Sequence, residues 1–114
     1  FARQHVVDVT QPHLIQLRRM IIAESARFPD LAAAWHRAGP ERGHATLAQQ
    51  IVTLTRRGLL WAPDPLLAAQ HLNYLILAVP VNEAMFTGTA ASRRRLHRYA
   101  DEAVRVFLAA YGTP

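Results

Sequence analysis

The sequence predicts an all-α domain of five helices, with a partial sixth at residues 1–9. Three observations support this fold class. Prolines and glycines fall where helices would start and end, apolar residues recur at helical spacing between them, and no stretch alternates apolar and polar residues long enough for a strand. The 114 residues, of which 51% are hydrophobic, suffice for one domain with a real core.

The first three helices are delimited by their prolines and glycines, because proline is favoured at the first helical position and glycine just past the last. We expect them at residues 12–27, with Thr10 or Gln11 as the cap, at residues 29–39, and at residues 40–57. Pro29 and Pro40 open the second and third of these helices.

The last two helices are longer. The fourth is expected at residues 65–87, after the cap Asp64 and before Gly88, and the fifth runs from the cap Ser92 to Tyr111, before Gly112. The fourth is apolar nearly all round and the fifth over an arc of roughly 200°, which predicts burial on both sides. A second copy of the chain is the natural cover, because two-fold homodimers dominate soluble oligomers. The residues expected at this interface are Leu72, Leu75, Ile76, Val79, Phe86, Leu96, Ala100, Val104, Phe107, Leu108 and Tyr111.

A membrane location is not predicted. Residues 65–82 carry no formal charge, but four polar side chains interrupt them, so we interpret the stretch as a buried helix. The chain starts without the pattern of a signal peptide and contains no cysteine, which favours a cytoplasmic protein.

Enzyme signatures are absent from the sequence. A single Glu-x-x-His pair occurs, at Glu41 and His44, whereas a four-helix di-metal site needs two such pairs. No His-Glu-x-x-His motif, phosphate-binding loop or nucleophile elbow occurs, so we predict neither an enzyme nor a bound cofactor or metal. A metal cluster built from histidines of different helices stays open, because spacing does not report tertiary proximity. The net charge is +5, and the cluster at residues 93–98 is interpreted as a solvated face rather than a DNA contact.

A ligand pocket is predicted between the first, third and fourth helices. On the fourth helix several residues of mixed character share about 80° of arc, as in pockets that are mostly apolar with a few polar groups. The predicted lining is Met20, Leu54, His71, Tyr74, Ala78, Asn82 and Met85. His71 or Asn82 would orient a mainly apolar ligand. The alternative is that these residues are hydrogen-bonded within the core or an interface. Pro80 predicts a kink that could open space for a ligand or follow the curve of the bundle.

The segment LRRMIIAESARFPDLA, residues 17–32, resembles the C-terminal regulatory domain of the TetR family of bacterial transcription regulators. RAGPERG (37–43), RRGLLWAPDPLLAAQHL (56–72) and YADEAVRVFLAAYG (99–112) add to the resemblance. It implies a ligand-binding domain that dimerises through its last two helices as a four-helix interface, and a separate N-terminal helix-turn-helix domain.

The predicted domain organisation is a single regulatory domain at residues 1–114, with the helix-turn-helix domain absent. We therefore expect the ligand-binding and dimerisation domain of a TetR-like repressor, contacting DNA only through that other domain. The alternative is a free-standing helical ligand carrier or protein-interaction module with no role at DNA.

Overall fold

Six α-helices and one π-helical turn make up the computed structural model, which describes all residues 1–114. They are α1 (Ala2–Val9), α2 (Pro12–Ala23), α3 (Pro29–His36), the π-helical turn η1 (Arg37–Glu41), α4 (Arg42–Arg56), α5 (Pro65–Thr87) and α6 (Arg93–Tyr111). Extended pairing is limited to one isolated bridge between Leu60 and Gly112. The prediction of an all-α fold with five to six helices is confirmed.

The ends of the two long helices are where the sequence predicted them. The Asp64 carboxylate accepts a hydrogen bond from the amide of Leu67 at 3.1 Å, and the Ser92 hydroxyl accepts one from the amide of Arg95 at 3.2 Å. These bonds satisfy amides that have no partner inside the helix. Gly88 ends α5 with a φ of +76°, a left-handed conformation in which other residues would be strained.

The predicted break at Gly39 and Pro40 is wrong. The chain stays helical from Pro29 to Arg56, because η1 joins α3 to α4 and the residues at its ends keep right-handed helical dihedral angles. Gly39 does not adopt a positive φ. A proline inside an α-helix lacks an N–H and crowds the preceding turn, and a π-turn widens the helix at that point. Proline is therefore accommodated here without ending the helix.

Two smaller differences concern α2. The helix ends at Ala23 rather than near Arg27, and the chain then turns before Pro29. Gln11 occupies the cap position but makes no capping bond, because its side-chain amide donates to the carbonyl of Val7 at 3.0 Å.

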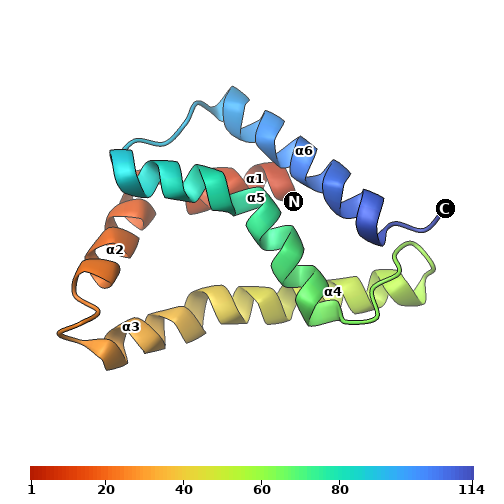
Figure 1. Cartoon of the computed structure of the whole chain (residues 1–114), viewed down its shortest axis with the longest axis horizontal. Helices are drawn as coiled ribbons and strands as arrows, with labels where there is room; N and C mark the ends of the chain where they lie inside the picture. Colours follow the sequence, from red (N-terminus) through yellow and green to blue (C-terminus); the bar gives the residue numbers. More distant parts are fainter.

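The helices form a flat, open arrangement. In Figure 1, α2, the continuous α3–α4 rod and α5 form three sides of a triangle, and α6 runs along the outside of α5. α5 packs against α1, α2, α4 and α6, and it bends partway along its length (Figure 1). It contains the buried Pro80, which has no N–H for the helical hydrogen-bond ladder, as expected for a kinked helix.

The core lies where α1, α4, α5 and α6 meet, and it is thin. The molecule measures 47 × 33 × 16 Å, and its radius of gyration of 15.2 Å exceeds the value of about 13 Å for a compact domain of this size. Its accessible surface is 7643 Å², against about 6,300 Å² for a typical monomer of this mass. Many apolar side chains therefore remain uncovered by this chain. None of the helices combines the length and apolar character needed to cross a membrane.

Candidate ligand site and dimer face

Five of the eleven residues predicted at a dimer interface are buried inside the protomer. They are Leu72, Ile76, Leu96, Ala100 and Phe107, all at most 8% exposed. They belong to the hydrophobic core that the two long helices form with α1 and α4. These side chains have no free surface for a partner. The sequence could not reveal this, because α5 is apolar on nearly every side and the apolar arc of α6 is wide enough to serve both a core and an interface.

The other predicted interface residues keep exposed or half-exposed side chains: Leu75, Val79, Phe86, Val104, Leu108 and Tyr111. On α5, Val79 is 44% exposed and Phe86 is 86% exposed. They are seven positions apart and therefore lie on one side of the helix, with Leu75 one turn earlier. On α6, similar spacing groups Tyr99, Val106 and Ala110, which are also exposed or half-exposed.

These six residues, Leu75, Val79, Phe86, Tyr99, Val106 and Ala110, are called the outer face below. The two helices run antiparallel (Figure 1). Their alignment is fixed by an ion pair between Arg95 and Glu83 and by a hydrogen bond between His71 and Tyr111. The outer face thus consists of one row of exposed or half-exposed apolar side chains on α5 and one on α6, two helices that pack against each other.

None of the seven residues predicted to line a pocket lies in either of the two hollows described below. Met20 is exposed, and Leu54 packs against the core. The Nδ1 atom of His71 lies 2.6 Å from the hydroxyl of Tyr111, and the amide of Asn82 donates to the carbonyl of Ala78 at 2.7 Å. Both polar groups are therefore engaged within the chain. Met85 is half-buried.

Tyr74 differs from the other predicted residues, because it lies beside a partly buried polar network. Its ring meets the ring of His44 edge to face, with 5.3 Å between centroids. The amide of Asn73 donates to Nε2 of His44 at 2.9 Å, and its carbonyl oxygen accepts from Nε2 of His5 at 2.8 Å. This network joins α1, α4 and α5.

The surroundings of His44 favour its neutral form. It is 6% exposed, and burial lowers the pKa of its imidazole, with a further lowering from the neighbouring His36. Its Nε2 accepts the bond from Asn73, which only a neutral ring can do. The ring therefore contributes an aromatic surface without a positive charge.

Arg18 belongs to α2, and its side chain reaches towards α3. Its guanidinium carbon is 5.0 Å from the ring centroid of Trp35, a cation–π arrangement. The side chain is half-buried, no carboxylate lies within 4 Å of it, and it makes no hydrogen bond within the chain. Burial lowers the pKa of Arg18, and the nearby Tyr74 acts weakly in the opposite direction. Arginine stays charged at neutral pH despite such shifts.

We call Arg18, Trp35, His44 and Tyr74 the Arg18 cluster. Each comes from a different helix: α2, α3, α4 and α5. Of these four residues, the sequence analysis identified only Tyr74 as a site residue. No spacing could have found the set, because each contact joins two different helices.

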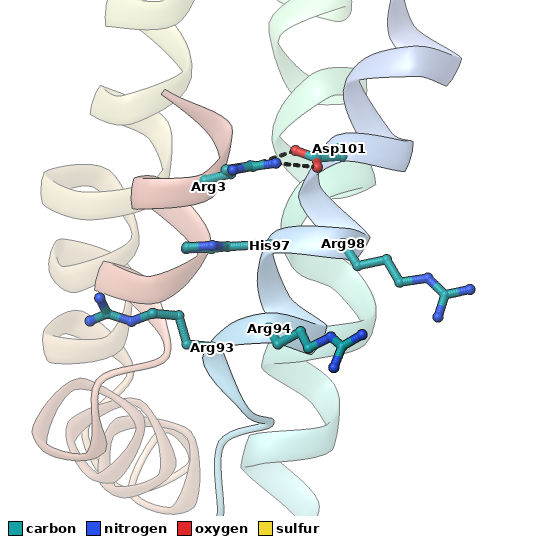
Figure 2. A pocket seen from close by; sticks show the side chains of 6 residues that line it. All are labelled: Arg3, Arg93, Arg94, His97, Arg98 and Asp101. Atoms are coloured by element: carbon teal, nitrogen blue, oxygen red, sulfur yellow. Dashed lines mark hydrogen bonds and ion pairs between the residues drawn. The ribbon is translucent and has the colours of Figure 1, made fainter.

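A second polar region is a shallow hollow of about 500 Å³ on the outside of α1 and α6. It is lined by Arg3, Arg93, Arg94, His97, Arg98 and Asp101. Figure 2 shows Arg3 paired with Asp101, while Arg93 extends to one side and Arg94 and Arg98 to the other. The guanidinium groups do not converge on one point, which fits a solvated basic face better than a site for a single anion.

Two further observations concern a possible metal site and a second hollow. No group of three or more His, Asp or Glu side chains is placed to hold a metal ion. Another hollow, of about 550 Å³, lies between α4 and the start of α5. It is lined by a mixture of apolar and polar residues: Ala45, Ala48, Gln49, Val52, Thr53, Arg56, Pro65 and Leu66. Neither hollow contains the Arg18 cluster.

The comparisons with known proteins agree with this architecture. Residues 1–113 match the C-terminal domain of AefR-like transcriptional repressors. A protein assigned to the TetR family of transcriptional regulators, from Mesorhizobium loti MAFF303099, is 44% identical with a TM-score of 0.94, and the match covers 98% of this chain and 56% of that protein. The flavonoid-responsive regulator FrrA is 25% identical with a TM-score of 0.82, covering 98% of this chain and 57% of FrrA.

A comparison with curated proteins found no match. The chain spans a little over half the length of the two solved relatives, and within that span it follows their fold nearly from end to end. The helix order, the matched family and the solved relatives agree, and the chain belongs to the TetR family of transcriptional regulators as a C-terminal domain of the AefR-like type.

Proposed function

We propose that this domain is the dimerisation and ligand-binding part of a cytoplasmic TetR-family repressor. In this proposal, two copies associate through the outer face, and a small aromatic molecule bound near the Arg18 cluster controls DNA binding by a helix-turn-helix domain. The single observation that carries the proposal is the outer face, an apolar surface on the two long helices that this chain leaves uncovered.

The shape of the domain supports a partner on that face. Its accessible surface exceeds the value for a typical monomer by more than about 1,000 Å², and a credible biological interface buries about that area or more. A two-fold arrangement would pair α5 and α6 with the same helices of a second copy. Phe86, the most exposed large apolar side chain, would then be removed from water.

Sedimentation of two adjacent variants tests the dimer. Val106→Glu places a charge on the outer face and should give a folded monomer. Phe107→Glu places a charge in the protomer core and should unfold the domain, because an unpaired buried charge costs several kcal/mol. Leu31→Glu, on an exposed residue of α3, serves as the control and should remain dimeric. A Val106→Glu protein that sediments as a dimer would place the interface elsewhere.

Ligand control is supported by the Arg18 cluster, which presents two partly exposed aromatic rings, those of Trp35 on α3 and Tyr74 on α5. The relative FrrA is described as flavonoid-responsive. A ligand can shift the DNA-binding equilibrium only by its difference in affinity for the two states.

The test joins this domain behind a helix-turn-helix domain and measures operator release with flavone as the probe. Release that disappears with Tyr74→Ala, while the dimer persists, is the expected result. Flavone that binds without affecting the operator complex would contradict ligand control.

A further inference from the structure

Arg18 carries a positive charge that has no ion-pair partner, and its side chain is partly shielded from water. Four other arginines, all more exposed, have carboxylate partners: Arg3, Arg27, Arg95 and Arg105. Arg18 has none, although burial lowers its pKa and so disfavours its charge. Removing an ion from water is costly unless a partner compensates. The protein alone supplies only the face of Trp35.

The surface around Arg18 is apolar. Leu14 and Ile22 lie one turn before and after it on the same side of α2, and they are 38% and 57% exposed. Trp35 borders it from α3, and the half-exposed Tyr74 borders it from α5. The guanidinium therefore lies in the middle of an accessible apolar and aromatic surface.

No charged side chain near Arg18 would prevent an anion from binding there. No carboxylate lies within 4 Å of it, and His44, whose ring contacts Tyr74, is neutral in its hydrogen-bonded state. A free inorganic anion would satisfy the charge but would leave Trp35, Tyr74 and the aliphatic side chains exposed. A neutral apolar ligand would cover those side chains but would leave the guanidinium desolvated and unpaired. A molecule that combines a flat ring system with a negative group satisfies both requirements.

We propose that the effector of this domain is a planar aromatic acid whose anionic group pairs with Arg18 while its rings lie against Trp35 and Tyr74. This inference rests on the proposed ligand-binding function and specifies the ligand class. It replaces the mainly apolar ligand expected from the sequence. Arginine suits the role because its planar guanidinium can both stack on an aromatic ring and bind a carboxylate through two parallel hydrogen bonds.

Matched probes separate the charge from the aromatic rings. Flavone-6-carboxylate and 2-naphthoate are each compared with their primary amides, which keep the size and planarity but lack the charge. Binding to the 114-residue chain is measured by calorimetry at pH 7.5, with the oligomeric state checked in parallel. We expect each carboxylate to bind at least about tenfold more tightly than its amide, since hydrogen bonds between charged groups are the stronger class.

Three variants assign that preference to Arg18. Arg18→Gln should reduce the carboxylate affinity to that of the amide and leave the amide affinity within about twofold. Arg18→Lys keeps the charge and should retain part of the preference, although it loses the two-pronged geometry. Arg19→Gln is the matched control, because Arg19 is exposed, lies beside Gly88 and makes no cation–π contact with Trp35. It should keep the full preference.

The outcomes distinguish this inference from the proposed function. Equal affinity for acid and amide in the unaltered chain, or a preference that survives Arg18→Gln, would overturn the role of Arg18 while leaving an aromatic ligand site in place. Binding of neither the acids nor the amides nor flavone would overturn both. The comparison of acid with amide in the unaltered chain remains decisive even if Arg18→Gln fails to fold.

Discussion

The Nδ1 atom of His71 lies 2.6 Å from the hydroxyl of Tyr111, so that one hydrogen bond joins α5 to the last turn of α6. The backbone carbonyl of Tyr111 also accepts from the amide of Trp61 at 2.7 Å. Tyr111 therefore ties the connector before α5 and the body of α5 to the end of the chain. The polar group of His71 is satisfied within the protein and serves the packing of these helices.

We expect Tyr111→Phe and His71→Phe each to lower the free energy of unfolding by about 1 kcal/mol, the usual net contribution of one hydrogen bond. The double variant should cost less than the sum of the two single variants, because both remove the same bond. Urea denaturation measures all three. His13→Phe, at an exposed residue of α2, is the control. Strictly additive effects would show that the bond contributes nothing.

The domain should lose stability as pH falls through about 6.5. Burial lowers the pKa of His44 in the folded state, so the unfolded chain, with an ordinary pKa near 6.5, binds the proton more readily. The free energy of unfolding should therefore be highest above about pH 7, fall as the pH drops below about 6.5, and stay reduced once the pH is below the folded-state pKa. Urea midpoints from pH 8 to pH 5 measure the effect.

His44→Gln should flatten this pH profile, because glutamine does not titrate. His13→Gln, at an exposed position, should leave the profile unchanged. An unaltered profile in His44→Gln would assign the pH dependence to other groups. Asp101 is separable from it, since a carboxylate titrates at lower pH.

The pKa of Asp101 should depend on Arg3. The guanidinium of Arg3 donates two hydrogen bonds to this carboxylate, at 2.8 and 2.6 Å, and they lower its pKa below the ordinary value. Arg3→Gln should raise the pKa of Asp101 towards that of a free aspartate, as followed by NMR titration. Arg94→Gln, whose side chain extends away from the pair in Figure 2, should change it far less. Equal shifts in both variants would indicate a general effect of basic charge.

Removal of the Asp64 cap should weaken the start of α5. Asp64→Ala deletes the acceptor for the amide of Leu67, and we expect a loss of about 1 kcal/mol in the free energy of unfolding. Asp64→Asn keeps an acceptor oxygen and should retain most of the stability. Thermal denaturation compares the two variants, and an equal loss in both would show that the carboxylate charge, rather than the cap bond, is what matters.

The fold was predictable where the determinants are local. Asp64, Ser92 and Gly88 mark helix ends through bonds and dihedral angles within a few residues, so the limits of α5 and α6 follow from the sequence. The sequence did not show which side chains of α5 lie in the core and which lie at the surface, because the helix is apolar on nearly every side. Leu72 and Ile76 were therefore expected at a partner and are found in the core.

The site was less predictable, because its contacts are tertiary. Arg18 and Trp35 meet across two helices, as do His44 and Tyr74, and no periodicity connects them. The sequence alone also does not distinguish a half-buried arginine from an exposed one. Only the folded chain shows that Arg18 has no carboxylate close to it.

The π-helical turn η1 sets which way two members of the Arg18 cluster point. Trp35 and His44 are nine positions apart, and at about 100° per residue an unbroken α-helix would direct them to opposite sides. A π-turn contains one more residue per hydrogen-bonded ring than an α-helix. The extra residue offsets the following helix by about 100°, the rotation of one residue. The directions of the two side chains then differ by only about a quarter turn. Trp35 can then meet Arg18 while His44 meets Tyr74. In this domain, one additional residue in a helical turn thus rotates the helix that follows, so that two aromatic rings lie on adjacent sides of the continuous α3–α4 rod.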